Sequence, residues 1–219
     1  MITYEELKKN QNIRTYIQKA DQSLLAMGYT EHSFPHVMKV ADTAAKILSE
    51  LGYGKRDQEL AQIAGYLHDI GNLVNRVDHS QSGAIIAFRI LEEIGMDAEE
   101  LSTVVTAIGN HDEGTGVAVN SIAAALILAD KSDVRRSRVR NNDSSTYDIH
   151  DRVNCSVTHS ELTVSEDKKV ITLILTVDTT ISPVIDYFQI FTGRMIMCRN
   201  AAHTLGLQFQ LIINGQSLM

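Results

Sequence analysis

The spacing of apolar residues changes near residue 141, and this change constrains the fold more than any other feature of the sequence. Before it, apolar residues recur at helical spacing, as in the segment from Pro35 to Leu51, and Gly52 fits the position just past a helix end. After it, apolar residues alternate with their neighbours over 170–177 and over 207–213, which is the pattern of a strand. A helical part is therefore expected to precede a part that contains a sheet.

The expected fold class is mostly α: an all-helical bundle over 1–145, then a small C-terminal α+β unit over 146–219 in the order strand, strand, helix, strand. Loop-forming residues from Asn141 to Ser145 mark the boundary. Thr3 and Glu6 form a capping-box pattern that starts the first helix. Further helices are expected over about 35–51, 57–70 and 82–94, from residue 97, over 120–134 and over 182–205, and strands over about 155–164, 170–177 and 207–213.

Six histidines and aspartates in separate segments indicate a metal site. They are His36, the adjacent pair His68 and Asp69, His79, His111 and Asp130. Imidazoles and carboxylates together suit divalent iron, manganese and similar first-row metals. Six ligands are more than one ion needs, so they could hold two ions with Asp69 between them. Asp130 lies in an apolar stretch, where a carboxylate that binds no cation would be costly to bury.

The order of these residues resembles the HD-domain superfamily of metal-dependent phosphohydrolases, which is named for the adjacent histidine and aspartate. The match runs from about Phe34 to Val134 and is strongest in the segment from Leu67 to Gly71. The resemblance implies a first metal site made of His36, His68, Asp69 and Asp130, and a second site that His79 and His111 complete. Many relatives carry lysine where this chain has Asn72, which removes a cation that in such relatives lies near the metal and the substrate. The Gly-Tyr-Pro signature of the cyclic-di-nucleotide branch is missing after His111, so hydrolysis of cyclic di-GMP is not expected.

Several charged residues are candidates for binding a substrate phosphate. Lys131 follows Asp130 as in related Asp-Lys pairs, Arg76 lies between the His-Asp pair and His79, and Arg135 begins a basic run that ends at Arg140. For each of them a salt bridge or a solvated surface is the alternative interpretation.

Two acidic residues and four further histidines have less defined roles. Asp112 and Glu113 could orient a ligand or donate a proton to a leaving group, or they could form a solvated acidic loop. The histidines outside the motif are expected not to be ligands: His32, His150, His159 and His203.

The function that these residues favour is hydrolysis of a phosphate ester or anhydride of a small phosphorylated molecule, a nucleotide above all. Two ions would activate the attacking water; iron and manganese are the first candidates, and nickel, cobalt, zinc and magnesium are alternatives. Asp69 and Lys131 are the expected catalytic residues. Two alternatives stay open: a di-iron oxygenase that uses the same ligands, and a non-catalytic module that senses a nucleotide.

Composition limits the partners and the location of the protein. The net charge of −7 argues against bulk nucleic-acid binding, which needs a basic surface. No apolar run approaches the length of a membrane-spanning helix, so no membrane partner is expected. The two cysteines and the charged N-terminal segment fit the reducing cytoplasm. The C-terminal unit could cover the active site, form a homodimer through an edge strand, or bind an effector.

Overall fold

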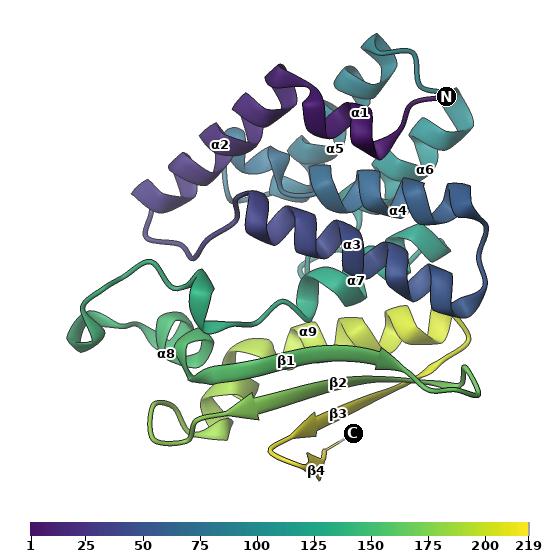
Figure 1. The fold of residues 1–219 in the computed structure, drawn as a ribbon. Helices are drawn as coiled ribbons and strands as arrows, with labels where there is room; N and C mark the ends of the chain where they lie inside the picture. The colour runs from purple at the N-terminus through teal and green to yellow at the C-terminus, as the bar shows by residue number, and fades with distance from the viewer. Residues whose placement is uncertain (219) are drawn as a thin grey trace.

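A computed structural model describes residues 1–218, in which a group of helices lies above a small sheet (Figure 1). The helical part contains α1 Tyr4–Lys9, α2 Gln11–Ala26, α3 Phe34–Leu51, α4 Lys55–Leu67, α5 His79–Glu93, α6 Ala98–Gly109 and α7 Ser121–Lys131, with short 3-10 helices η1 Ile70–Leu73, η2 Arg136–Arg138 and η3 Ser144–Thr146. The C-terminal part contains α8 Ile149–Ser156, β1 Val157–Val164, β2 Val170–Val177, α9 Val184–Thr204, β3 Gln208–Ile213 and β4 Gln216–Ser217. The predicted fold class, a helical bundle followed by a small α+β unit, is confirmed.

The helices begin and end at the residues whose side chains favour those positions. Thr3 forms the predicted capping box with Glu6 at the start of α1. Asp97 accepts hydrogen bonds from two backbone amides at the start of α6. Gly52 ends α3 with φ of 90°, a left-handed conformation that glycine adopts without a steric penalty.

Several element boundaries differ from the sequence prediction, and the helix expected over 120–134 already ends at Lys131. The helix expected over 57–70 ends at Leu67, and the chain continues into η1, which directs His68 and Asp69 inward. The helix expected from residue 82 begins at His79. The strand expected from residue 155 begins at Val157, because the preceding segment forms α8, a helix that the sequence analysis did not predict.

The four strands form one sheet in the order β1-β2-β3-β4. β1 and β2 are antiparallel, β2 and β3 are parallel, and β3 and β4 are antiparallel. A parallel pair needs a crossover connection, and α9 supplies it between β2 and β3. Alternate residues of β2 and β3, including the paired Leu173 and Leu211, are buried on the face that packs against α9.

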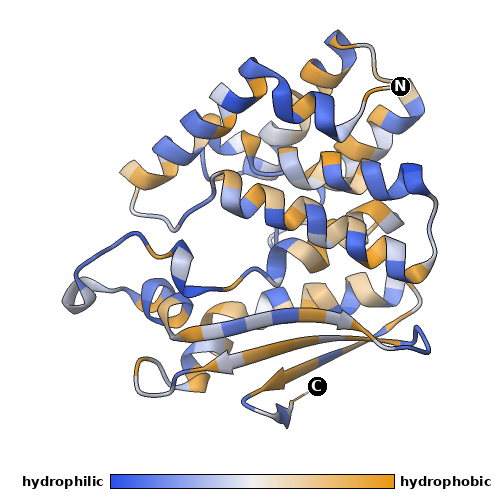
Figure 2. Cartoon of the chain, in the orientation of Figure 1, coloured by the Kyte–Doolittle hydropathy of each residue, from blue (hydrophilic) through white to orange (hydrophobic). Residues whose placement is uncertain are grey.

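Two hydrophobic clusters form the core, and α7 takes part in both. The first cluster lies among α1 to α7 and the second lies between α9 and the sheet. Every residue of α7 from Ile122 to Lys131 is buried, and α7 packs against both α3 and α9. Figure 2 shows the alternation of apolar and hydrophilic residues along the helices, as expected for elements with a buried face. The C-terminal unit is therefore attached directly to the helix that carries Asp130.

No helix within residues 1–218 combines the length and the apolar character that crossing a membrane requires. The division at residue 145 and a homodimer through an edge strand stay predictions.

Candidate metal centre

The six predicted metal ligands come together in the helical part of the structure, and all six are buried. Each lies at or near the end of a helix, where the chain can direct a side chain into a shared space. His36 lies in the first turn of α3, His68 ends α4, Asp69 precedes η1, His79 opens α5, His111 follows α6, and Asp130 lies in the last turn of α7.

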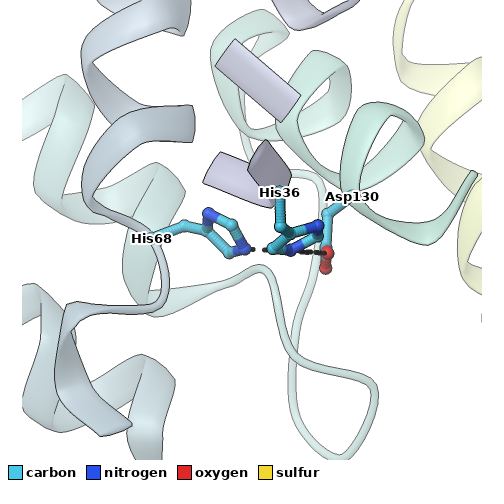
Figure 3. Close-up of side chains that lie close together, drawn as sticks. All are labelled: His36, His68 and Asp130. Atoms are coloured by element: carbon cyan, nitrogen blue, oxygen red, sulfur yellow. Dashed lines mark ion pairs between the residues drawn. The ribbon is translucent and has the colours of Figure 1, made fainter. Parts of the chain in front are cut away.

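Asp69 lies between two groups of imidazoles. Its Oδ2 is 3.5 Å from His36 Nε2 and 3.3 Å from His68 Nε2, whereas its Oδ1 is 3.5 Å from His79 Nε2. Asp130 Oδ1 completes the first group, at 3.3 Å from His36 Nε2 and 3.6 Å from His68 Nε2 (Figure 3). The two oxygens of one carboxylate therefore face different sets of nitrogen atoms.

All four histidines direct Nε2 toward this centre because their Nδ1 atoms are bonded elsewhere. The acceptors are the carbonyl oxygens of Gly65 for His68 (2.7 Å), Arg76 for His79 (3.1 Å) and Ile108 for His111 (2.6 Å), and the carboxylate of Asp133 for His36 (2.8 Å). A carbonyl oxygen only accepts, so Nδ1 carries a hydrogen in those three rings, and in the neutral form of each ring the lone pair is on Nε2. This arrangement is typical of metal-binding histidines.

The residues at the centre fit a divalent cation. Nε2 of His36, Nε2 of His68 and Oδ2 of Asp69 are buried and have no hydrogen-bond partner among the described residues, which is costly without a cation. His79 Nε2 and His111 Nε2 lie 3.1 Å apart although both carry a lone pair. Adjacent ligand atoms on one octahedral ion are about 3.0 Å apart, so this separation is that of two ligands of one metal.

Two sets of ligand atoms are compact enough to hold an ion, each with its atoms within 4.8 Å of one another. One set is His36, His68 and Asp130, and the other is His68, Asp69 and His111. His68 belongs to both. The resemblance to HD proteins implied that His68 belongs to the first site alone. Its place in the second set as well is a difference between the structure and that expectation.

The carboxylates and imidazoles at the centre shift one another's pKa. Burial disfavours the charged ring of His68, but Asp69 and Asp130 outweigh it and raise the pKa of His68 to about 10. Burial lowers the pKa of His111 well below its usual value, and the positively charged neighbours add to the effect. Burial opposes ionisation of Asp69 and Asp130, yet His68 and Lys131 respectively hold the pKa of each carboxyl well below its usual range.

Asp133 is a residue of this site that the sequence analysis missed. Its fully buried carboxylate accepts the Nδ1 hydrogen bond of His36 and lies 2.9 Å from Lys39 Nζ and 2.9 Å from Arg135 Nε, with Arg138 Nη1 at 3.8 Å. The only sequence signal was its place three residues after Asp130, at the end of an apolar helix.

A cavity of about 480 Å³ opens beside the ligands and is lined by Asp69, His79, His111 and Asp130. Of the predicted phosphate-binding residues, Lys131 and Arg76 also line it. Arg135 does not: its guanidinium pairs with Asp133 and Glu31. Arg194 of α9 lines the cavity as well, and no feature of the sequence indicated it.

The acidic loop after α6 is only partly solvated. Glu113 lines the cavity, with Oε1 3.4 Å from Lys131 Nζ and 2.6 Å from Arg194 Nε. Asp112 Oδ1 is 4.0 Å from His79 Nε2. A fully solvated acidic loop would not make these contacts, which place the loop at the edge of the cavity.

Three further residues of the predicted motif region have defined places. Asn72 is fully buried and donates from Nδ2 to the Oδ1 atom of Asp69 at 3.0 Å, so it orients that carboxylate where relatives would have a lysine. His32 and His150 line the cavity but belong to neither set of ligand atoms. Burial lowers the pKa of His32 well below its usual value.

Comparison with known proteins identifies the family. An uncharacterized protein of Methanocaldococcus jannaschii is 29% identical over 191 residues, which cover 76% of this chain and 73% of that protein. Ribonuclease Y of Enterococcus faecalis is 31% identical over 119 residues and ribonuclease Y of Bacillus subtilis is 32% identical over 117, which cover 54% and 52% of this chain. These matches span only 21% of each ribonuclease. No solved structure matches the chain.

The model of the HD domain matches residues 34–146, more than half of the chain and the whole of the ligand cluster. This chain therefore belongs to the HD-domain family, a superfamily of metal-dependent phosphohydrolases.

Proposed function

We propose that this protein hydrolyses a phosphate ester or anhydride of a small phosphorylated molecule, specifically a nucleotide, with two divalent ions of iron or manganese. The observation that carries this proposal is the position of Asp69, whose two oxygens face two sets of imidazole nitrogens beside a cavity. A carboxylate placed in this way is suited to bridge two ions. When bound, the ions would lower the pKa of a water molecule and polarise the phosphoryl oxygens.

The chain's own residues would orient the reactants. His36, His68 and Asp130 would hold one ion, His79 and His111 the other, and Asp69 both. Asp69 Oδ2 has no hydrogen-bond partner among the described residues, so it can orient the attacking water or accept its proton. Asn72 keeps that carboxylate in position through Oδ1.

Lys131 supports a phosphorylated substrate. Burial disfavours its charged form, but Asp130 and Glu113 outweigh it and raise its pKa, so the ammonium stays charged at neutral pH. It lines the cavity and can offset the charge of a phosphoryl group. The cavity of about 480 Å³ falls within the range of roughly 300–1,000 Å³ that is usual for small-molecule sites.

The size of the cavity and the charge of the chain favour a small molecule over RNA. Ribonuclease Y, by its name, acts on RNA, but the shared region covers about a fifth of that protein. The net charge of −7 is unsuited to neutralising many phosphates of a nucleic acid. An RNA oligonucleotide belongs among the substrates to be tested.

The test is the metal content of protein purified without chelator, with phosphate release from a nucleotide panel, a chromogenic phosphodiester and an RNA oligonucleotide under manganese. Wild type should hold close to two ions per chain and His111→Ala close to one, with activity lost. His203→Ala, at an exposed position of α9 outside the centre, is the control. One ion per chain, unchanged in His111→Ala, would refute the second site. Two irons with oxygen consumption and no hydrolysis would favour the oxygenase, and nucleotide binding without turnover the sensing module.

A further inference from the structure

One wall of the cavity comes from α9, which lies between α7 and the sheet (Figure 1). Ile190, Phe191 and Arg194 of this helix line the cavity. The C-terminal unit is thus part of the site, although the ligands of the centre all come from the helical part. Of the three α9 residues that line the cavity, Arg194 is the charged one.

Two contacts hold the guanidinium of Arg194 in place. Its Nε forms an ion pair with Glu113 Oε1 at 2.6 Å, and its central carbon lies 4.2 Å from the centroid of the Phe191 ring. Phe191 is itself buried, so the surface against which the guanidinium stacks is rigid. A side chain that is already ordered loses little conformational entropy when it binds a ligand.

The outer nitrogens of Arg194 are left free for a ligand. None of residues 1–218 accepts a hydrogen bond from its Nη1 or Nη2, and the side chain keeps 23% of its exposure. Arg138, another lining residue, donates instead to the backbone carbonyls of Glu31 and Asp133. The planar fork of an arginine matches two oxygens of a phosphate.

Arg194 does not have its carboxylate partner to itself. Glu113 Oε1 contacts both Arg194 and Lys131, so two cations share one carboxylate. Lys131 also pairs with Asp130 at 2.7 Å, but Asp130 is a candidate ligand whose charge a metal would offset. The ion pairs connect Asp130 to Lys131, Lys131 to Glu113, and Glu113 to Arg194. A group bound by Arg194 would therefore be separated from the candidate ligand Asp130 by two further side chains.

We propose that Arg194 recognises a second phosphate of the substrate, beyond the phosphoryl group held at the metal centre. The substrate class is then a molecule with at least two phosphate groups, such as a nucleoside diphosphate or triphosphate. This inference rests on the proposed hydrolase function. It makes α9 of the C-terminal unit a determinant of substrate specificity.

The test is calorimetric binding of pyrophosphate and of inorganic phosphate to the manganese-loaded full chain. Wild type should prefer pyrophosphate. Loss of a charged, bidentate contact in Arg194→Ala should weaken pyrophosphate binding by about 10- to 100-fold and leave phosphate binding unchanged. Arg194→Lys keeps the charge but not the fork, so its affinity should be intermediate. Arg199→Ala, at an exposed position of the same helix, is the matched control.

A kinetic readout separates recognition from catalysis. Arg194→Ala should raise KM for nucleoside triphosphates by the factor expected for pyrophosphate binding, about 10- to 100-fold, with kcat retained. 4-Nitrophenyl phosphate has only one phosphate, so the variant should turn it over as wild type does. Metal content and melting temperature of each variant show whether the centre is intact. If Arg194→Ala unfolds, Arg194→Lys and Arg194→Gln carry the test.

The outcomes distinguish this inference from the proposed function. A wild type without preference for pyrophosphate, or an equal loss of both anions in Arg194→Ala, would overturn the role of Arg194 even if hydrolysis occurs. A preference for pyrophosphate that depends on Arg194, with no hydrolysis of any compound, would support the role of Arg194 and refute the hydrolase.

Discussion

Replacing Asp133 with asparagine should weaken metal binding without touching a ligand atom. The carboxylate of Asp133 accepts the Nδ1 hydrogen bond of His36 at 2.8 Å, which keeps Nε2 directed at the centre. Asparagine has the same shape and can still accept through Oδ1, but its hydrogen bond to the ring is no longer assisted by charge. Loss of such a partner typically lowers metal affinity by about 10- to 100-fold.

The same change should destabilise the metal-free fold. Burial opposes ionisation of Asp133, but the His36 hydrogen bond and the charges of Arg138 and Lys39 outweigh it and lower its pKa, so the carboxylate is charged at neutral pH. The side chain of Arg138 is only 5% exposed and would lose its nearby counter-charge. Removing one partner of a buried pair costs about 3–5 kcal/mol. Because Arg138 keeps two backbone acceptors and Lys39 is 41% exposed, we expect the lower end, about 3 kcal/mol.

Competition with a fluorescent chelator measures the manganese affinity, and urea unfolding in excess chelator measures the free energy of unfolding. Asp42→Asn, at an exposed position of α3, is the control because it removes a carboxylate from the helix that carries His36. Unchanged manganese affinity in Asp133→Asn would refute the role of Asp133 in orienting His36. A lower stability with unchanged affinity would show that its role is structural only.

Three further predictions follow from burial and packing. Because its pKa is raised to about 10, His68 is protonated at neutral pH in the metal-free protein, and metal binding should release this proton; calorimetry in buffers of different ionisation heat measures the release. The stabilisation that the proton gives the metal-free fold should be complete below about pH 6.5 and should be lost as the pH rises through about 10. Burial raises the pKa of the Cys198 thiol to about 12, so this thiol should be unreactive in the folded protein. In a Cys155→Ser variant, Ellman's reagent at pH 8 should react only after denaturation, and rapid reaction of the folded protein would contradict this burial. Gly65→Ala would place a Cβ 2.7 Å from the backbone of α3 and should lower the free energy of unfolding by about 1–3 kcal/mol or more. Gly193→Ala is the control because its Cβ meets nothing within 4 Å. Equal urea midpoints for the two variants would show that α3 and α4 do not pack this closely.

The fold class could be predicted from the sequence because its signals are local, whereas the grouping of the metal-site candidates came from the resemblance to HD-domain proteins. Helical and alternating periods reveal the type of each element, and the apolar flanks of His68 and Asp69 mark a buried pair. The segment Ile149–Ser156 was missed as a helix because it is short and mostly polar. The side chain of Asp148 accepts a hydrogen bond from the backbone amide of Asp151 at the start of this helix, but aspartate is equally common in loops, so its presence did not indicate a helix.

The order and type of the elements, and the residue types that can bind a metal, follow from the amino-acid sequence, since period, capping and residue chemistry are properties of single positions and their neighbours. The position of Asp133 behind His36 depends on tertiary packing, because the two residues are 97 positions apart. Tertiary packing also decided that Arg194 faces the cavity, because the packing of α9 on α7 orients that side chain. Such contacts depend on how helices pack, and no local pattern specifies which face of a distant helix meets the site.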